Sequence, residues 1–135
     1  MPKRYLFDTD VLIAYLRGYP QAVELLKDLA AQRFDFLISP VTIIEIEAGI
    51  RDTEKAKTYE LLDIFEVCSV DRSIAHLAGS SLRKYQKKGV TLGLADVIIA
   101  ATAVTHHLTL VTYNTSQYPI SELQILSPPA LLEVS

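Results

Sequence analysis

One apolar stretch decides how this chain folds, and it reads Leu94-Ala95-Asp96-Val97-Ile98-Ile99-Ala100-Ala101-Thr102-Ala103-Val104. It is long enough for roughly three helical turns, and it is apolar on every side except at Asp96. A helix that is hydrophobic all round is normally buried. An acid in such surroundings is expected to form a pair, to change its protonation state or to hold a metal. Asp96 is therefore a candidate functional residue.

Two other acids are also set in apolar runs. Asp8 follows Tyr5-Leu6-Phe7, and Glu45 lies within Val41-Thr42-Ile43-Ile44-Glu45-Ile46. We predict that Asp8, Glu45 and Asp96 meet around a divalent cation, because three carboxylates brought together repel unless a proton or a cation neutralises them. Oxygen ligands of this kind suit Mg²⁺ or Mn²⁺. Such a metal activates a bound water and stabilises charge on a phosphoryl oxygen, which makes phosphodiester hydrolysis the expected reaction class.

Each of these acids also has a purely structural interpretation. Asp8 is a common residue type in a turn before a helix, and Glu45 would suit the solvated face of an amphipathic helix. Asp96 would be stabilised by the positive end of its own helix, which is compatible with a site as well.

Spacing separates Glu45 from its neighbour Glu47. Glu47 falls four residues before Arg51, the arrangement of an exposed ion pair on a helix. Glu45 instead shares a helical stripe with Thr42 and Gly49, and the glycine would leave free volume beside the carboxylate. We therefore predict a functional Glu45 and a structural Glu47.

Length and composition favour one compact domain over residues 1–135. Half of the residues are hydrophobic and 21% are charged, which is ordinary for a folded protein. The longest apolar runs contain an acid or stop well short of the roughly 18 residues of a membrane span, so we expect no membrane association. The net charge of −3 argues weakly against a chain coated in nucleic acid and leaves room for a local basic patch.

The start of the chain indicates where the protein works. Met1-Pro2-Lys3-Arg4 is followed at once by a strand-like run, which leaves no room for a signal peptide, so we expect an intracellular, cytoplasmic protein. The single cysteine, Cys68, fits a reducing compartment, and we expect a buried and unreactive thiol.

Strands and helices alternate along the chain. The expected strands cover residues 4–7, 34–38, 66–70 and 108–112, with a short fifth near 124–126. The helices between them cover residues 10–16, 20–33, 40 to 49 or 51, 53–65, 71–88 and 94–104. Their expected caps are Asp10 or Thr9, Ser39, Asp52 or Thr53, and Asp71.

This alternation predicts βαβ units and the α/β class: a three-layer α/β/α fold with a central, mainly parallel sheet of four to five strands. Sites in such sheets form beyond the carboxyl ends of the strands. Asp8 follows the first expected strand and Asn114 follows the fourth, at the start of a turn through Pro119. Both residues should therefore lie at one edge of the sheet.

Four segments together carry a family resemblance. They are Leu6-Phe7-Asp8-Thr9-Asp10-Val11-Leu12-Ile13, Thr42-Ile43-Ile44-Glu45-Ile46-Glu47-Ala48-Gly49-Ile50, Leu94-Ala95-Asp96-Val97-Ile98-Ile99-Ala100-Ala101-Thr102-Ala103 and Leu110-Val111-Thr112-Tyr113-Asn114. In this order they resemble the successive motifs of the PIN-domain ribonucleases, and the chain's size is most like that of the VapC-type toxins. The resemblance implies an Mg²⁺- or Mn²⁺-dependent endoribonuclease, usually dimeric and blocked by a small antitoxin. Asp8, Glu45 and Asp96 take the metal-ligand positions.

The chain departs from this family in its last motif. The family often has a fourth acid there, whereas this chain has Asn114 and, three residues on, Gln117. Asn114 still offers a carbonyl to a metal-bound water, and Thr112 offers a hydroxyl. Thr9 and Thr112 are candidate supporting residues. The smaller negative charge predicts weaker metal binding.

Basic residues provide candidate RNA contacts. Arg83, Lys84, Lys87 and Lys88 form a cluster at a helix end, although the usual outcome for such a run is a solvated surface. Arg17, flanked by Tyr15 and Tyr19, lies near the expected site edge. His106 and His107 follow the apolar helix, where they complement its dipole, and we expect a structural role.

Two alternatives remain at this stage. The first is a haloacid-dehalogenase-like phosphatase with Asp8 as nucleophile and Asp10 as general acid, although it gives Glu45 no role. The second is a catalytically inactive PIN-like module that binds without cleaving.

Overall fold

The computed structural model describes residues 4–32, 34–114 and 123–127. Five strands form one sheet in the order β3-β2-β1-β4-β5, and all its pairings are parallel. The strands are β1 (Arg4–Phe7), β2 (Asp35–Ile38), β3 (Glu66–Val67), β4 (Thr109–Val111) and β5 (Gln124–Leu126). The predicted parallel sheet of an α/β fold is confirmed.

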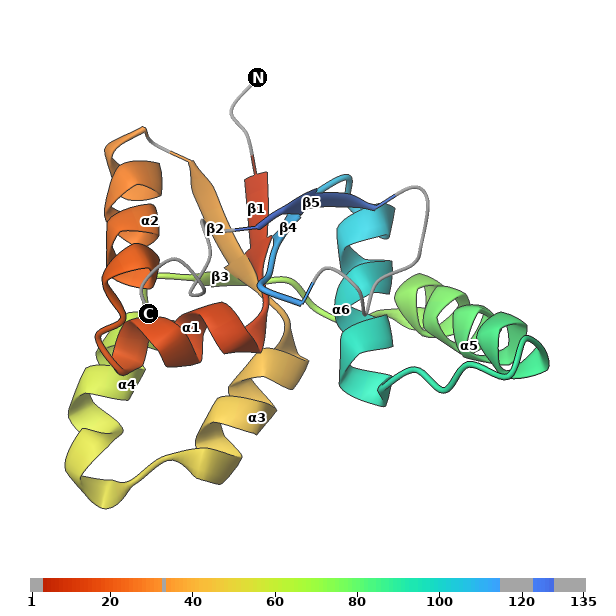
Figure 1. The fold of residues 1–135 in the computed structure, drawn as a ribbon, viewed down its shortest axis with the longest axis horizontal. Helices are drawn as coiled ribbons and strands as arrows, with labels where there is room; N and C mark the ends of the chain where they lie inside the picture. The colour runs from red at the N-terminus through yellow and green to blue at the C-terminus, as the bar shows by residue number, and fades with distance from the viewer. Residues whose placement is uncertain (1–3, 33, 115–122, 128–135) are drawn as a thin grey trace.

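The helices lie on both faces of this sheet (Figure 1). They are α1 (Thr9–Leu16), α2 (Pro20–Ala31), α3 (Pro40–Gly49), α4 (Lys55–Leu62), α5 (Arg72–Lys87) and α6 (Leu94–Thr105), with a short 3₁₀ helix η1 (Asp52–Glu54). In Figure 1, α1, α2 and α4 lie to the left of the sheet, while α6 and then α5 lie to its right.

Alternation along β1 explains these layers, because neighbouring side chains of a strand point to opposite faces. Phe7 belongs to a buried cluster with Val11 of α1 and Leu61 of α4. Leu6 belongs to a second cluster with Ile99 of α6. The sheet is therefore covered on both faces, as a parallel sheet requires.

The α6 helix is buried as its sequence predicts. Ile99 and Ala100 are fully buried against the sheet, while Val97 and Ala101 pack against α5. Its C-terminal end is closed by His106, the C-cap, and by His107, which has φ 54°. Both histidines are exposed. Among the described residues, no helix is long and apolar enough to cross a membrane.

Several predicted boundaries were wrong for identifiable reasons. The strand predicted over 66–70 ends at Val67, because its partner β2 ends at Ile38 and only the amide of Cys68 still reaches the Ile38 carbonyl, at 2.8 Å. The helix predicted over 53–65 starts as a 3₁₀ turn and ends at Leu62, because Phe65 turns into the core. The expected Asn114–Pro119 turn lies mostly outside the described residues.

Candidate active site

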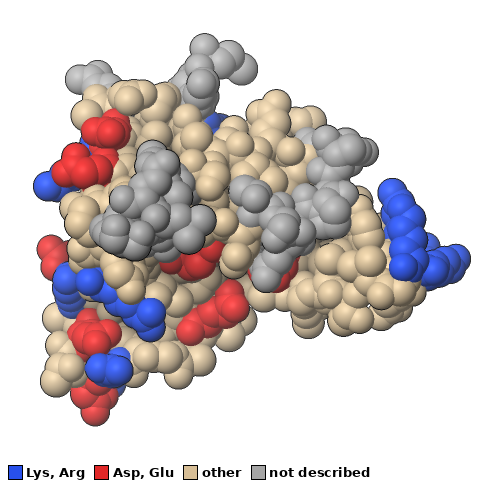
Figure 2. Space-filling model, in the orientation of Figure 1, with Lys and Arg blue, Asp and Glu red and all other residues tan. Residues whose placement is uncertain are grey.

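The carboxyl ends of the parallel strands bring distant motifs to one edge. β1 leads through Asp8 into α1, and β2 leads through Ser39 into α3. Figure 1 shows α1 and α3 leaving the sheet at this edge, with the first turn of α6 on the same side. Figure 2 shows acidic side chains near the middle of this face, between the part formed by α1 and α3 and the part formed by α6.

Asp8 is held in place by its own helix and by the last strand. Its side chain is buried, and Oδ1 accepts a hydrogen bond from the amide of Thr9 at 2.7 Å. This contact makes Asp8 the cap of α1, so the predicted caps, Thr9 and Asp10, were wrong by one and two residues. Oδ2 accepts from the hydroxyl of Thr112 at 2.8 Å, across 104 residues of sequence.

Thr9 connects Asp8 with Glu45. Its hydroxyl donates to Oε1 of Glu45 at 2.7 Å and lies 3.2 Å from the hydroxyl of Thr42. Thr9 and Thr42 are buried, whereas Glu45 is exposed on α3. One buried hydroxyl therefore fixes the carboxylate of Glu45 next to the residue that caps α1.

Glu47 differs from Glu45, although not by the predicted ion pair. Its carboxylate accepts a hydrogen bond from the hydroxyl of Tyr59 at 2.7 Å, and Arg51 lies 4.0 Å from Glu54 instead. The predicted pair of Glu47 with Arg51 was wrong because α3 ends at Gly49, so Arg51 no longer follows helical spacing. Glu47 keeps its predicted structural character.

Asp96 lies in the first turn of α6 and is half-buried. A Cβ built at the preceding Gly93 would come within 3.1 Å of its Oδ2, so the carboxylate folds back over the start of its own helix. α6 contacts α3, the helix that carries Glu45. The first turn of α6, which carries Asp96, therefore lies on the side of the sheet where α3 carries Glu45.

Asp10 is a further acid at this edge, and its sequence position had indicated a helix cap. Its Oδ2 accepts from the amide of Tyr113 at 3.2 Å and lies 3.5 Å from the hydroxyl of Thr112. Its Oδ1 is buried with no hydrogen-bond partner in the described part of the chain. Burial, and then the negative charge of Asp8, raise the pKa of Asp10 to about 7. The sequence Asp8-Thr9-Asp10 shows that a second acid follows Asp8 by two residues, but a role as a helix cap was the simpler explanation of Asp10.

The segment after β4 completes the edge. Thr112 is buried, and besides donating to Asp8 its hydroxyl accepts from the amide of Asn114 at 3.1 Å. Asn114 itself is exposed. Gln117 lies outside the described residues.

The donor chemistry of this edge suits a hard cation. The carboxylates of Asp8, Glu45, Asp10 and Asp96 are oxygen ligands of the kind that Mg²⁺ and Mn²⁺ prefer. The buried Oδ1 of Asp10 lacks the partner that a proton or a cation would supply. Within residues 4–32, 34–114 and 123–127, however, no three acid, histidine or cysteine side chains are arranged to hold a metal ion. Asp8 and Glu45 accept hydrogen bonds from threonine hydroxyls, and each carboxylate keeps further lone pairs with which it could bind a cation.

The basic residues predicted as candidate RNA contacts lie in two separate places. Arg17 lines a groove together with Glu45. The cluster of Arg83, Lys84, Lys87 and Lys88 belongs to the C-terminal end of α5, where Figure 2 shows blue atoms at the end of the molecule, away from the acidic group.

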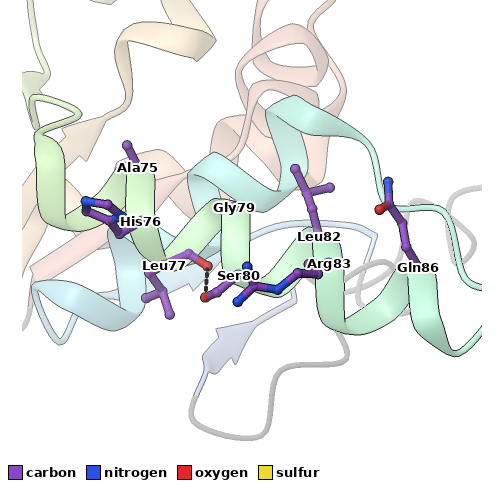
Figure 3. A pocket seen from close by; sticks show the side chains of 8 residues that line it. All are labelled: Ala75, His76, Leu77, Gly79, Ser80, Leu82, Arg83 and Gln86. Carbon is purple, nitrogen blue, oxygen red and sulfur yellow. Dashed lines mark hydrogen bonds between the residues drawn. The ribbon is translucent and has the colours of Figure 1, made fainter.

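A hollow of about 710 Å³ follows α5. Figure 3 shows His76, Ser80 and Arg83 along it, with Ser80 donating to the carbonyl of Leu77 at 3.0 Å. None of the candidate acids lines it, so we do not assign it to the active site.

Comparison with known proteins agrees with this α/β fold. The family model described as "PIN domain" matches residues 5–123, and the chain therefore belongs to the PIN domain family. Within that family it is of the VapC type. It is 38% identical over 124 residues to "Ribonuclease VapC10" of Mycobacterium tuberculosis, covering 92% of this chain and 91% of that protein. It is 30% identical to "Ribonuclease VapC19" of the same organism, covering 92% of this chain and 98% of that protein.

Solved structures support the same fold. A chain of the "Toxin-antitoxin complex from Klebsiella pneumoniae" superposes with a TM-score of 0.77 and is 29% identical, with 94% of this chain and 99% of that chain covered. This family assignment leaves no support for the phosphatase alternative.

Proposed function

We propose that this protein is a metal-dependent endoribonuclease that hydrolyses phosphodiester bonds in RNA, and that it acts as the toxin of a toxin–antitoxin pair. The observation that carries the proposal is the bridge from Asp8 through Thr9 to Glu45, which brings two motifs 36 residues apart to one edge of the sheet. The names of its VapC relatives support the reaction class.

Each residue at the edge has a defined part in this proposal. Asp8, Glu45 and Asp96 would hold Mg²⁺ or Mn²⁺, which supplies an activated water and charge stabilisation on the phosphate. Thr9 orients Glu45, and Thr112 orients Asp8, through the hydrogen bonds described above.

Asn114 stands where the family often has a fourth acid. It offers a neutral amide to hydrogen-bond a water, and Asp10 supplies a further carboxyl group at the same end of β4. We propose that Asp10, when it is ionised above its raised pKa of about 7, makes up part of the negative charge that Asn114 lacks.

The test is cleavage of a mixed RNA pool with and without Mn²⁺, with the cut ends mapped. Asp8→Asn, Glu45→Gln and Asp96→Asn should each reduce cleavage at least ~100-fold while circular dichroism stays unchanged, since each removes a charged oxygen ligand. Glu47→Gln is the matched control on α3 and should cleave like wild type. If all three variants cleave as well as wild type, the mechanism is wrong.

The inactive binding module is the second candidate, and the neutral Asn114 is the observation that favours it. Calorimetric titration of Mn²⁺ into wild type and Asp96→Asn separates the two. Binding to wild type and weaker binding to the variant supports the nuclease, whereas no binding to either supports the module.

We further propose that the chain works as a cytoplasmic homodimer, one domain over residues 1–135, and binds a small antitoxin. The structural relative from a toxin–antitoxin complex supports an antitoxin partner, while the dimer follows from the family resemblance. Light scattering on the purified chain tests the dimer, and a monomer at all concentrations would contradict it.

A further inference from the structure

A groove of about 330 Å³ lies between α1, α3 and the η1–α4 segment. Its volume is at the lower end of the ~300–1,000 Å³ range of small-ligand sites, so it suits a nucleotide-sized group. Its lining includes the apolar side chains of Ile13, Leu16 and Ile50, two arginines, Arg17 and Arg51, and two acids, Glu45 and Glu54.

The groove adjoins the proposed active site through Glu45. The same carboxylate that lines the groove accepts the 2.7 Å hydrogen bond from Thr9, the residue next to Asp8. Gly49 also lines the groove, and a Cβ there would meet nothing within 4 Å. The free volume predicted beside Glu45 is therefore confirmed, and a chain that reaches the acidic edge has space to continue into the groove.

Two guanidinium groups line this space and are available to an anion. Arg17 forms no ion pair within the described part of the chain. Arg51 approaches Glu54 only to 4.0 Å, with side chains 82% and 50% exposed, and such a pair contributes little. A phosphate can displace it, because arginine binds phosphate oxygens with two parallel hydrogen bonds.

The basic cluster at the end of α5 (Arg83, Lys84, Lys87 and Lys88) is a weaker candidate for binding a phosphate. Lys84 and Lys88 lie 5.9 and 5.5 Å from the centroid of the Tyr85 ring, and such exposed contacts are as weak as the pair of Arg51 with Glu54, so the position of the cluster decides. That end of α5 lies away from the acidic group in Figure 2.

We propose that the groove binds the single RNA strand beside the scissile phosphate, with Arg17 and Arg51 on backbone phosphates and the apolar floor of Ile13, Leu16 and Ile50 against a base or ribose. This inference rests on the proposed ribonuclease function and assigns the substrate path at the same site. Single strands are usually bound by basic residues that follow the backbone and by aromatic side chains that stack on the bases. In this groove the arginines supply the phosphate contacts, and aliphatic side chains take the place of the aromatic ones.

Fluorescence anisotropy with a labelled single-stranded RNA in EDTA tests the groove without any cleavage. Arg17→Ala and Arg51→Ala should each weaken binding about tenfold, since each removes charged hydrogen bonds. Each should also make the plot of log affinity against log salt shallower by about 0.7, the effect of one lost phosphate contact on a single strand.

Arg17→Lys and Arg51→Lys should retain most of the salt slope, because the charge remains. Arg72→Ala, at the exposed start of α5, is the matched control and should bind like wild type. Replacing Arg83, Lys84, Lys87 and Lys88 together with Glu should also leave the affinity largely intact.

Unchanged affinity and salt slope in the Arg17→Ala/Arg51→Ala double variant would overturn the inference, and so would wild-type protein that binds no RNA. The groove would then suit a protein segment instead. Wild-type cleavage with Mn²⁺ together with unaffected binding by the double variant would mean that only the groove is wrongly assigned. Loss of binding in the variants without any wild-type cleavage would mean that only the proposed hydrolysis fails.

Discussion

Threonine hydroxyls decide where the acids of this site lie. Thr9 donates to an exposed carboxylate, Glu45, whereas Thr112 donates to a buried one, Asp8. Water can replace the first donor but has little access to the second carboxylate. Near-isosteric replacement by valine should therefore have different consequences at the two positions.

We expect Thr112→Val to lower the free energy of unfolding by ~1–3 kcal/mol, since it removes a hydroxyl that donates to the buried carboxylate of Asp8. Thr9→Val should cost less than ~1 kcal/mol but reduce RNA cleavage, because Glu45 loses its orienting contact. Urea denaturation and cleavage rates check both expectations. Equal stability of the two variants would contradict this account of Asp8.

Asp10 gives the molecule a pH dependence in the absence of metal. Its pKa is raised to about 7 in the folded chain, first by burial and then by Asp8, so the folded state binds a proton that the unfolded chain has released above about pH 4. The free energy of unfolding should therefore fall as the pH rises from about 4 to about 7.

Asp10→Asn should remove this dependence and make the protein more stable at pH 8 in EDTA, by ~1–2 kcal/mol after allowance for its partial exposure. Denaturation at pH 5 and pH 8 measures the difference between the variant and wild type. Parallel pH profiles for the two proteins would show that Asp10 is not the titrating group.

At the scale of elements, caps decide where helices begin. Asp71 caps α5 by accepting from the amide of Ile74 at 2.9 Å, as its sequence position predicts. The cap of α1 was harder to predict, because Asp8, Thr9 and Asp10 are all suitable residue types. Only the tertiary contacts of Asp10 with Tyr113 show that its carboxylate is used elsewhere.

We expect Asp71→Ala to cost ~1 kcal/mol of unfolding free energy, since the amide of Ile74 loses its acceptor. Asp71→Asn keeps an acceptor oxygen and should recover most of this loss. Thermal and urea unfolding of the pair provide the measurement, and an equal loss in both variants would mean that charge and not capping matters.

Sequence periodicity was sufficient for the layers and the sheet but not for every contact of the site. The apolar run Tyr5-Leu6-Phe7 is typical of a buried strand, and the positions of Asp8 and Asn114 directly after expected strands predict one shared edge. The length of β3 was not predictable in this way, since it depends on where β2 ends. The bridge from Thr9 to Glu45 joins separate helices, so no local pattern reports it.

At the scale of the whole molecule, α6 joins the sheet to α5. Ile99 is fully buried against Leu6 and Leu110, while other residues of the same helix pack on α5. Asp96 lies in the first turn of α6, and its position is therefore set by the core packing of residues further along the same helix.

Ile99→Ala should lower the free energy of unfolding by ~2–5 kcal/mol, since it opens a cavity under α6. Ile44→Ala, at a side chain that is 66% exposed, is the matched control and should change it by less than ~1 kcal/mol. Denaturation by urea measures both. A small effect at Ile99 would mean that α6 is not anchored through this face.

The strand order has a consequence for how the protein is made. β4 pairs with β1, yet Thr112 follows Asp8 by 104 residues. During translation, a ribosome therefore exposes the Asp8 half of the edge long before it has added Thr112. The proposed active site is therefore incomplete for most of the synthesis of the polypeptide. During that time, this copy of the proposed nuclease cannot cleave the messenger RNA that is being translated.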